Sequence, residues 1–300
     1  RCHHVVVGIA RTVAGAVLLV AGTAVVADQI AKRAFGRPPR RRGEPPVDAL
    51  DVGIPASHGP DLRAWFLPGS GGGPAAVVIH GWGGNAGDMV PVADRLHGLG
   101  LHVLLVDAHG HGRSPAITVS SMPAFARDVH DAIRWLRSRD DVDGSRVVLV
   151  GHSVGAGACL YAASDDSGVA AVVALAPMAD PVGFMSVKMR GRLPGPLIPL
   201  ALRYVEHAIG HRFEDFTPVT TIGRVASPVL IVHGTQDTTV PVAHAQMLHH
   251  RSTTSTLCIV DGADHFSVDS LDHVDLLGFL AHAAVLDQPR DSQSVLGIGS

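Results

Sequence analysis

Short apolar segments recur along the chain from residue 75 onward, each followed by a polar or glycine-containing turn. They lie at 75–80, 101–107, 146–151, 169–177, 228–234 and 256–262. Because these segments are apolar at nearly every position, we expect strands that are buried on both faces. The stretches between them predict helices at 86–99, 122–137, 154–163, 243–250 and 268–284. This alternation predicts an α/β domain with a doubly wound, mostly parallel sheet flanked by helices.

One interval, at about 180–225, interrupts the alternation. It contains no strand-like run and includes the sequence "GRLPGPLIPLALRYVEHAIG". Long insertions in compact domains are usually lids or binding segments, so we expect a short, helical cap here. The alternative is a long surface excursion without a function.

The N-terminal region has a different pattern. Residues 5–27 carry a single charge, Arg11, and a bilayer core needs roughly 20 apolar residues. The alternatives are a cleaved signal peptide and a buried helix, but no strongly basic region precedes the run and "VVADQ" is a poor cleavage site. We therefore expect an N-terminal membrane-anchor helix within residues 1–30.

Residues 31–46 form a basic linker rich in proline and arginine. The excess of basic residues after the apolar run favours a cytoplasmic position for the domain that follows, and these charges can also bind anionic lipid. We expect that domain to span 47–288, with a tail at 289–300. The basic residues are Lys32, Arg33, Arg37, Arg40, Arg41 and Arg42.

Composition narrows the classes of function. Hydrophobic residues make up 46% of the 300 residues and charged residues 17%, which excludes a disordered chain. A formal net charge of −3 gives no electrostatic basis for binding nucleic acid. Aromatic residues are only 4% of the chain, so the core must consist mainly of Val, Ala and Leu.

Cysteine and histidine patterns indicate neither a metal site nor a disulfide framework. The three cysteines lack C-x-x-C spacing. His109 and His111 form an H-x-H pair and His249 and His250 are adjacent, but no acidic or cysteine ligands complete a set. We expect no metal and no cofactor. The cysteines are Cys2, Cys159 and Cys258.

Ser153 lies in the pattern G-x-S-x-G, formed with Gly151 and Gly155. Glycine is abundant in this chain, so the pattern alone is weak evidence. It does, however, follow a predicted strand and precede a predicted helix, as a sharp nucleophile turn requires. The two glycines remove the steric clash of such a turn, and the helix N-terminus favours developing negative charge.

A base and an acid for Ser153 follow in the loops after the last two predicted strands. His265 lies in "DGADHFSVD" and Asp237 in "HGTQDTTVP". Either residue alone could simply be solvated, but the order Ser, Asp, His matches that of this turn class. The three residues therefore predict a catalytic triad. Asp180, just after the strand at 169–177, is an alternative acid.

The glycine-rich segment at 79–85, "IHGWGGN", follows the first predicted strand. Here we expect the backbone N–H of Trp82, or alternatively of Gly81, to form an oxyanion hole together with the N–H of Val154. A phosphate cradle is the other interpretation, but neither G-x-G-x-x-G nor a P-loop lysine is present.

Taken together, these motifs resemble those of the serine hydrolases with the α/β-hydrolase fold, over roughly residues 60–285. The resemblance implies that Ser153, Asp237 and His265 form the triad, with Trp82 and Val154 at the oxyanion hole. In family order, the motifs are "HGWGG" at 80–84, "DAHGHGRS" at 107–114, "GHSVG" at 151–155, "HGTQDTTVP" at 233–241 and "GADHF" at 262–266.

The segment "DAHGHGRS" is similar to the family turn D-x-R-G-x-G-x-S, with His109 where arginine is common. That turn is structural in most members, so we expect a structural role for Asp107, His111 and Ser114. An apolar N-terminal segment before such a domain also resembles the membrane-tethered, Bem46-like branch.

The sequence favours a serine hydrolase that cleaves carboxylic esters with hydrophobic acyl groups through an acyl-enzyme. A peptidase or amidase, a thioesterase and an acyltransferase would use the same residues. A membrane-tethered binding protein without turnover is the alternative from another class. The expected partners are a small ester or lipid-like substrate and, through the N-terminal helix, a membrane; no nucleic-acid partner is expected.

Overall fold

The computed structural model describes residues 42–286. The expected membrane anchor, most of the basic linker and the tail at 289–300 lie outside the described residues. Within the described part, none of the helices combines the length and the apolar character needed to cross a bilayer.

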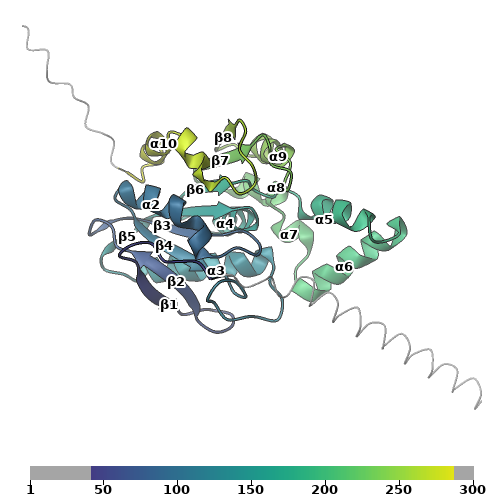
Figure 1. Cartoon of the computed structure of the whole chain (residues 1–300), viewed down its shortest axis with the longest axis horizontal. Helices are drawn as coiled ribbons and strands as arrows, with labels where there is room; N and C mark the ends of the chain where they lie inside the picture. Colours follow the sequence, from purple (N-terminus) through teal and green to yellow (C-terminus); the bar gives the residue numbers. More distant parts are fainter. Residues whose placement is uncertain (1–41, 287–300) are drawn as a thin grey trace, which may run out of the picture.

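An eight-stranded sheet forms the centre of the domain, with strand order β1-β2-β4-β3-β5-β6-β7-β8 (Figure 1). The six strands β4, β3, β5, β6, β7 and β8, in sheet order, run parallel to one another. Strand β2 is antiparallel to both β1 and β4. The predicted doubly wound, mostly parallel sheet is therefore confirmed. The strands are β1 (Leu50–Ile54), β2 (Leu62–Leu67), β3 (Gly73–Ile79), β4 (His102–Asp107), β5 (Val142–His152), β6 (Val169–Leu175), β7 (Val229–Gly234) and β8 (Ser255–Val260).

Strands β1 and β2 were not predicted from the sequence. β1, "LDVGI", is mostly exposed or half-buried and is an outer strand of the sheet. It lacks the continuous apolar character by which the six strands from β3 to β8 were predicted. The two strands form an antiparallel hairpin, and β2 also pairs with β4, where Arg63 lies opposite Asp107.

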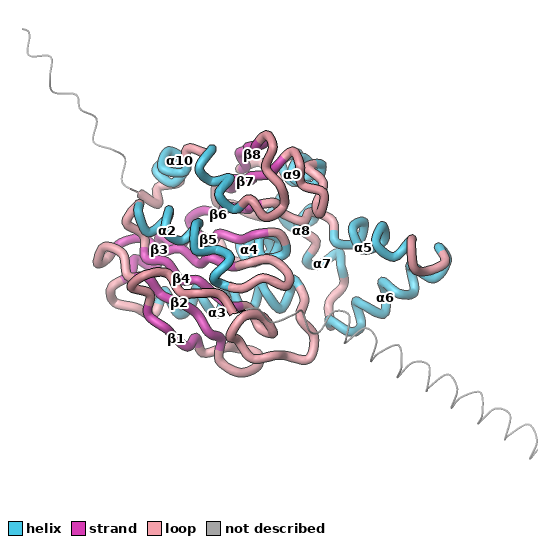
Figure 2. The backbone as a smooth tube through the Cα atoms, viewed as in Figure 1, coloured by secondary structure: helices cyan, strands magenta, loops and turns pink. Residues whose placement is uncertain are grey.

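Helices cover both faces of the sheet, as expected (Figures 1 and 2). Side chains of β3 alternate between the two apolar cores: Ala75, Val77 and Ile79 join α3 and α4 on one face. Ala76 and Val78 join α2 and α10 on the other. The helices outside the cap are η1 (Ala86–Met89), α2 (Val90–Gly98), α3 (Met122–Arg137), α4 (Val154–Asp165), α9 (Ala243–Arg251), η4 (Val268–His273) and α10 (Leu276–His282).

The prediction of one continuous helix at 268–284 was wrong. It is divided into the 3-10 helix η4 and the α-helix α10. Asp275 lies between them, and its side chain accepts a hydrogen bond from the N–H of Gly278, 2.8 Å away. This N-cap begins a new helix, since an N-cap residue has non-helical backbone angles.

The interval 180–225 consists of helices and turns in the structure (Figure 2). It connects β6 to β7, two neighbouring strands, and its first two α-helices reach away from the rest of the domain (Figure 1). Its elements are α5 (Pro181–Arg190), η2 (Gly195–Leu197), α6 (Ile198–Ile209), α7 (Phe213–Phe216), α8 (Pro218–Thr221) and η3 (Ile222–Arg224).

Candidate active site

Ser153 occupies a strained turn between β5 and α4. Its φ of 55° and ψ of −115° lie in a region that side-chain-bearing residues rarely adopt. The residue is the N-cap of α4, and the N–H of Val154 is the first of the helix, where no intrahelical acceptor exists. The turn thus holds the serine hydroxyl beside unpaired N–H groups at a helix N-terminus.

Gly151 and Gly155 are required by close backbone packing at this turn. A Cβ added at Gly151 would lie 2.5 Å from the carbonyl group of Gly155. A Cβ added at Gly155 would lie 2.3 Å from the carbonyl oxygen of His80. Backbone atoms on both sides leave no flexible group that could move, so the serine turn and the loop after β3 pack directly against each other.

We expect Gly155→Ala to destabilise the fold, although alanine is the better helix former. Overpacking typically costs roughly 1–3 kcal/mol, against a propensity gain of about 1 kcal/mol. Chemical denaturation should show the loss. Gly191→Ala is the control, because an added Cβ there meets nothing within 4 Å. Equal stability of the two variants would contradict the steric argument.

The structure brings Ser153, His265 and Asp237 together from three separate loops. His265 Nε2 lies 3.0 Å from Ser153 Oγ, and His265 Nδ1 lies 2.7 Å from Asp237 Oδ2. All three residues are at most 8% exposed. Each follows the carboxyl end of a different strand: β5, β8 or β7. The arrangement is a continuous chain of hydrogen bonds from the carboxylate to the hydroxyl.

The second oxygen of Asp237 fixes the carboxylate in place. Asp237 Oδ1 accepts hydrogen bonds from the N–H groups of Thr239 and Val240, at 2.8 and 2.7 Å. The alternative acid, Asp180, is the N-cap of α5 and accepts from the N–H of Gly183 at 3.0 Å. Asp237, and not Asp180, is therefore the carboxylate bonded to His265.

The loop after β3 runs directly over Ser153. A Cβ added at Gly81 would lie 3.1 Å from Ser153 Cβ. The carbonyl of Gly81 accepts from the N–H of Gly84, and within residues 42–286 the N–H of Trp82 donates no hydrogen bond to the protein. The loop thus brings Gly81, the residue before Trp82, against the serine.

Two buried histidines, which had no role in the sequence prediction, support this arrangement. His80 Nδ1 donates to the carbonyl of Gly81 at 2.7 Å, and His152 Nε2 donates to the carbonyl of His265 at 2.6 Å. Burial lowers the pKa of each to about 4, so both rings are neutral near pH 7. Both lie within motifs of the sequence, His80 in "HGWGG" and His152 in "GHSVG", which is the one signal that could have identified them.

His233 is a third neutral histidine, and its ring contacts the carboxylate of Asp237. Its Nε2 lies 2.8 Å from the carbonyl oxygen of Val240 and 3.2 Å from Asp237 Oδ2. Burial lowers the pKa of His233, which keeps the ring neutral and a donor through Nε2. His233 therefore orients Asp237 without adding a positive charge next to His265.

The turn after β4 is held by its own polar side chains, as the sequence indicated. Asp107 accepts from the N–H of Ala86 at 2.7 Å and from the N–H of Arg113 at 3.0 Å. Ser114 Oγ donates to the carbonyl of Asp107, and His111 Nδ1 lies 3.1 Å from the carbonyl oxygen of His109. These bonds fix the loop that lies beside the oxyanion-hole candidates.

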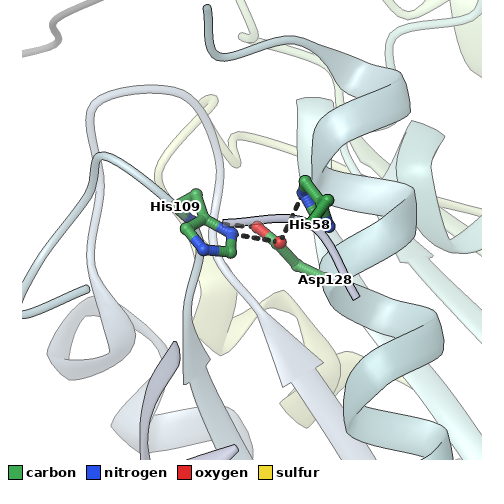
Figure 3. A group of neighbouring side chains, drawn as sticks. All are labelled: His58, His109 and Asp128. Atoms are coloured by element: carbon green, nitrogen blue, oxygen red, sulfur yellow. Dashed lines mark hydrogen bonds and ion pairs between the residues drawn. The ribbon is translucent and has the colours of Figure 1, made fainter. Parts of the chain in front are cut away.

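His58, His109 and Asp128 form a group whose potential ligand atoms all lie within 4.8 Å of one another (Figure 3). His109 Nδ1 lies 2.6 Å from Asp128 Oδ1, and its Nε2 lies 2.8 Å from the carbonyl oxygen of Pro60. Both partners are acceptors, so both nitrogens of His109 carry protons and no lone pair remains for a metal.

The group is therefore best described as a buried ion pair. Burial disfavours the charged ring, but the hydrogen bond and negative charge of Asp128 outweigh it and raise the pKa of His109. His109 takes the position where the family turn usually has arginine, and it provides a cation there. The sequence contained no spacing that joins His109 to Asp128, because the two residues meet only through packing of α3 against the loop.

We expect His109→Ala to destabilise the protein by about 3–5 kcal/mol, because it removes the cation paired with the buried Asp128 carboxylate and leaves only the backbone N–H of residue 109 and the ring of His58 beside it. His109→Arg keeps a cation that does not titrate. Since the pKa of His109 is raised by folding, its contribution is complete below about pH 6.5 and is lost as the pH rises through the raised value. Denaturation between pH 6 and 9 should therefore show wild type losing stability relative to His109→Arg. A constant difference would contradict this account.

Together, the sheet order, the strained serine turn after β5 and the hydrogen-bonded Ser, His and Asp side chains define the class of the α/β-hydrolases. Residues 74–210 match the family model described as serine aminopeptidase, S33. An uncharacterised protein of Mycobacterium tuberculosis is 31% identical over 245 residues, with coverage of 79% of this chain and 81% of that protein. The chain belongs to the α/β-hydrolase family and is a hydrolase.

Two other relatives and one solved structure are also similar to the chain. The uncharacterised protein YfhR of Escherichia coli is 27% identical over 245 residues, 78% of this chain and 79% of its own length. The polyketide transferase GrgF of Penicillium is 32% identical over 136 residues, 44% of this chain and 46% of that protein. Among solved structures, an esterase of Pyrococcus furiosus has a TM-score of 0.65 at 22% identity, covering 83% of this chain and 98% of that one.

Proposed function

We propose that this hydrolase cleaves carboxylic esters through an acyl-enzyme, with Ser153 as nucleophile, His265 as general base and Asp237 as its orienting carboxylate. The observation that carries the proposal is the unbroken series of hydrogen bonds, 2.7 Å from Asp237 to His265 and 3.0 Å from His265 to Ser153. A nucleophile is identified by such contact with a base that is itself oriented by a third group.

The proposed reaction has two steps. His265 Nε2 takes the proton of Ser153 as Oγ bonds to the ester carbonyl carbon, and then gives that proton to the departing alkoxide. Water next attacks the acyl-serine, again losing a proton to His265, and the acid leaves as Ser153 regains its hydrogen. In both steps the N–H groups of Trp82 and Val154 would donate to the oxyanion.

Exposed apolar side chains beside the triad support a hydrophobic substrate. Phe266 follows His265 directly, is 74% exposed and has its ring centre 5.2 Å from that of His265. Trp82, on the loop over Ser153, is 39% exposed. The two rings provide apolar surface close to the triad, and we propose that they contact the acyl chain.

Two other hydrolytic or transfer activities use the same residues. The family model is described as a serine aminopeptidase, which keeps amide substrates as an alternative. The relative GrgF is a polyketide transferase, which keeps acyl transfer, including transfer from a thioester. A binding protein without turnover is less compatible with the site, because a protein that had lost catalysis in evolution would not be expected to preserve these hydrogen-bond distances.

We also propose that residues 1–30 anchor the protein in a membrane and that the catalytic domain faces the cytoplasm. The support is the sequence alone: the apolar run at 5–27 and the basic residues that follow it. A relationship to the Bem46-like branch would fit this arrangement and remains part of the proposal.

A chain-length series tests the ester proposal. We expect hydrolysis of p-nitrophenyl esters from acetate to laurate, with kcat/KM rising from acetate to a longer acyl chain, and slower cleavage of aminoacyl p-nitroanilides. Phe266→Ala should reduce the preference for long chains more than the rate on acetate. Faster cleavage of the anilides would favour the peptidase. Failure of all substrates, with no labelling by a fluorophosphonate, would overturn the hydrolytic proposal for this site.

A further inference from the structure

The end of α5, the start of α6 and the residues between them combine exposed apolar and exposed basic side chains at the outer end of the cap. We call residues 187–200 the cap tip. Its most exposed apolar side chains are Val187 at 64%, Leu197 at 47% and Leu200 at 67%. In Figure 1 the two helices carry this segment away from the sheet, so the body of the domain does not cover it. Such a surface needs a partner to be buried.

The net charge of the pair of helices α5 and α6 is opposite in sign to that of the whole protein. Residues 181–210 contain four Lys or Arg and a single Glu, whereas the chain has a net charge of −3. The one acid, Glu206, accepts from the N–H of Phe213 at 2.9 Å and is thus engaged at the base of the cap. The tip carries Lys188, Arg190 and Arg192, all exposed.

These three cations are not neutralised within the protein. Within residues 42–286, none of them forms an ion pair with a carboxylate, and Lys188 instead lies over the ring of Phe184, 5.4 Å from its centre. Apolar side chains surrounded by free cations are the pattern of a segment that lies in the interface of an anionic bilayer.

The first described residues of the domain lie at the same edge of the sheet as the candidate active site. A Cβ added at Gly43 would lie 2.5 Å from Gly87 Cα, so the described chain begins against the helix that follows the loop over Ser153. That loop and the cap follow the carboxyl ends of the parallel strands β3 and β6 and lie at the same edge of the sheet. The basic linker in the sequence ends at this same edge.

From these observations we infer that the cap tip docks onto anionic lipid, with Val187, Leu197 and Leu200 entering the interface and the three cations binding lipid phosphates. The active-site edge then faces the bilayer. This inference does not depend on the ester chemistry, since it concerns where the cap lies and not what Ser153 attacks.

A fluorophore attached at the tip provides a direct test. In the full chain, with Cys2 and Cys258 replaced by serine and the buried Cys159 kept, Leu197→Cys is labelled with an environment-sensitive dye. The protein is added to phosphatidylcholine vesicles with or without phosphatidylglycerol. We expect a shift of emission to shorter wavelength only with phosphatidylglycerol. Asp140→Cys, an exposed position in the turn before β5, is the control and should show no shift.

The basic residues provide the second variant. Each basic residue near an anionic surface contributes about a factor of five, so replacing Lys188, Arg190 and Arg192 by Gln should reduce the equilibrium constant for docking roughly 100-fold. An N-terminal anchor, being the same in every variant, cannot imitate this result. An equal shift with neutral vesicles, an equal shift at position 140, or a shift that follows protein concentration without lipid would overturn the inference. The last of these would indicate a second copy of the chain.

Discussion

Replacing Ser153 by alanine is expected to lower kcat on p-nitrophenyl esters by about 10⁴–10⁶-fold while leaving the fold intact. The hydroxyl is the only atom lost, and His265 then has no group from which to take a proton. Residual hydrolysis above the rate in water would come from the oxyanion hole and from substrate binding. Steady-state kinetics and loss of fluorophosphonate labelling would measure the effect.

Ser120→Ala is the matched control for this substitution. Ser120 is also buried, at 3% exposed, and within residues 42–286 its hydroxyl has no hydrogen-bond partner. Its removal should change neither kcat nor labelling. If Ser153→Ala kept more than a small fraction of the wild-type rate, the nucleophile would have to be another residue, and the proposed acyl-enzyme would be incorrect.

Replacing Asp237 by asparagine is expected to lower kcat by about 10⁴-fold, through the tautomer of His265. The N–H groups of Thr239 and Val240 both donate to Asp237 Oδ1. An asparagine must place its oxygen there, which directs its NH₂ group at His265 Nδ1. That nitrogen becomes the acceptor, and Nε2 then carries the proton and cannot accept one from Ser153.

Asp180→Asn discriminates between the two candidate acids. Asp180 caps α5 by accepting from the N–H of Gly183, a bond that asparagine can also make. We therefore expect near wild-type kcat and stability for this variant. A large loss of rate in Asp180→Asn, with little loss in Asp237→Asn, would reverse the assignment of the acid.

The inner part of the fold could be predicted from the sequence because burial on both faces imposes an unbroken apolar pattern. The helix at 122–137 was predicted with the bounds that the structure has. The hairpin was missed because β1 is mostly exposed or half-buried and because the charged, exposed Arg63 interrupts the apolar run of β2. The break at Asp275 was missed because the apolar periodicity continues across it, while the local N-cap decides where the helix begins.

The geometry of the candidate site was predictable to the extent that its residues follow strand ends. Ser153, Asp237 and His265 each come after an apolar strand, and parallel strands place their carboxyl ends at one edge. The supporting residues were not predictable in this way. His109 and Asp128 meet only when α3 packs against the turn after β4, and the roles of His80 and His152 depend on which carbonyl lies in front of each ring.

The cap enters and leaves the domain at nearly the same point, because the N–H of Val219 donates to the carbonyl of Ala179 at 3.1 Å. Residues 180–218 are thus an excursion closed at its base by a backbone hydrogen bond, between two strands that are already neighbours. Replacement of this excursion by one of another length need not move any residue that carries the chemistry. In protein engineering, residues 180–218 can therefore be exchanged as a unit without rebuilding the strands that carry Ser153, Asp237 and His265.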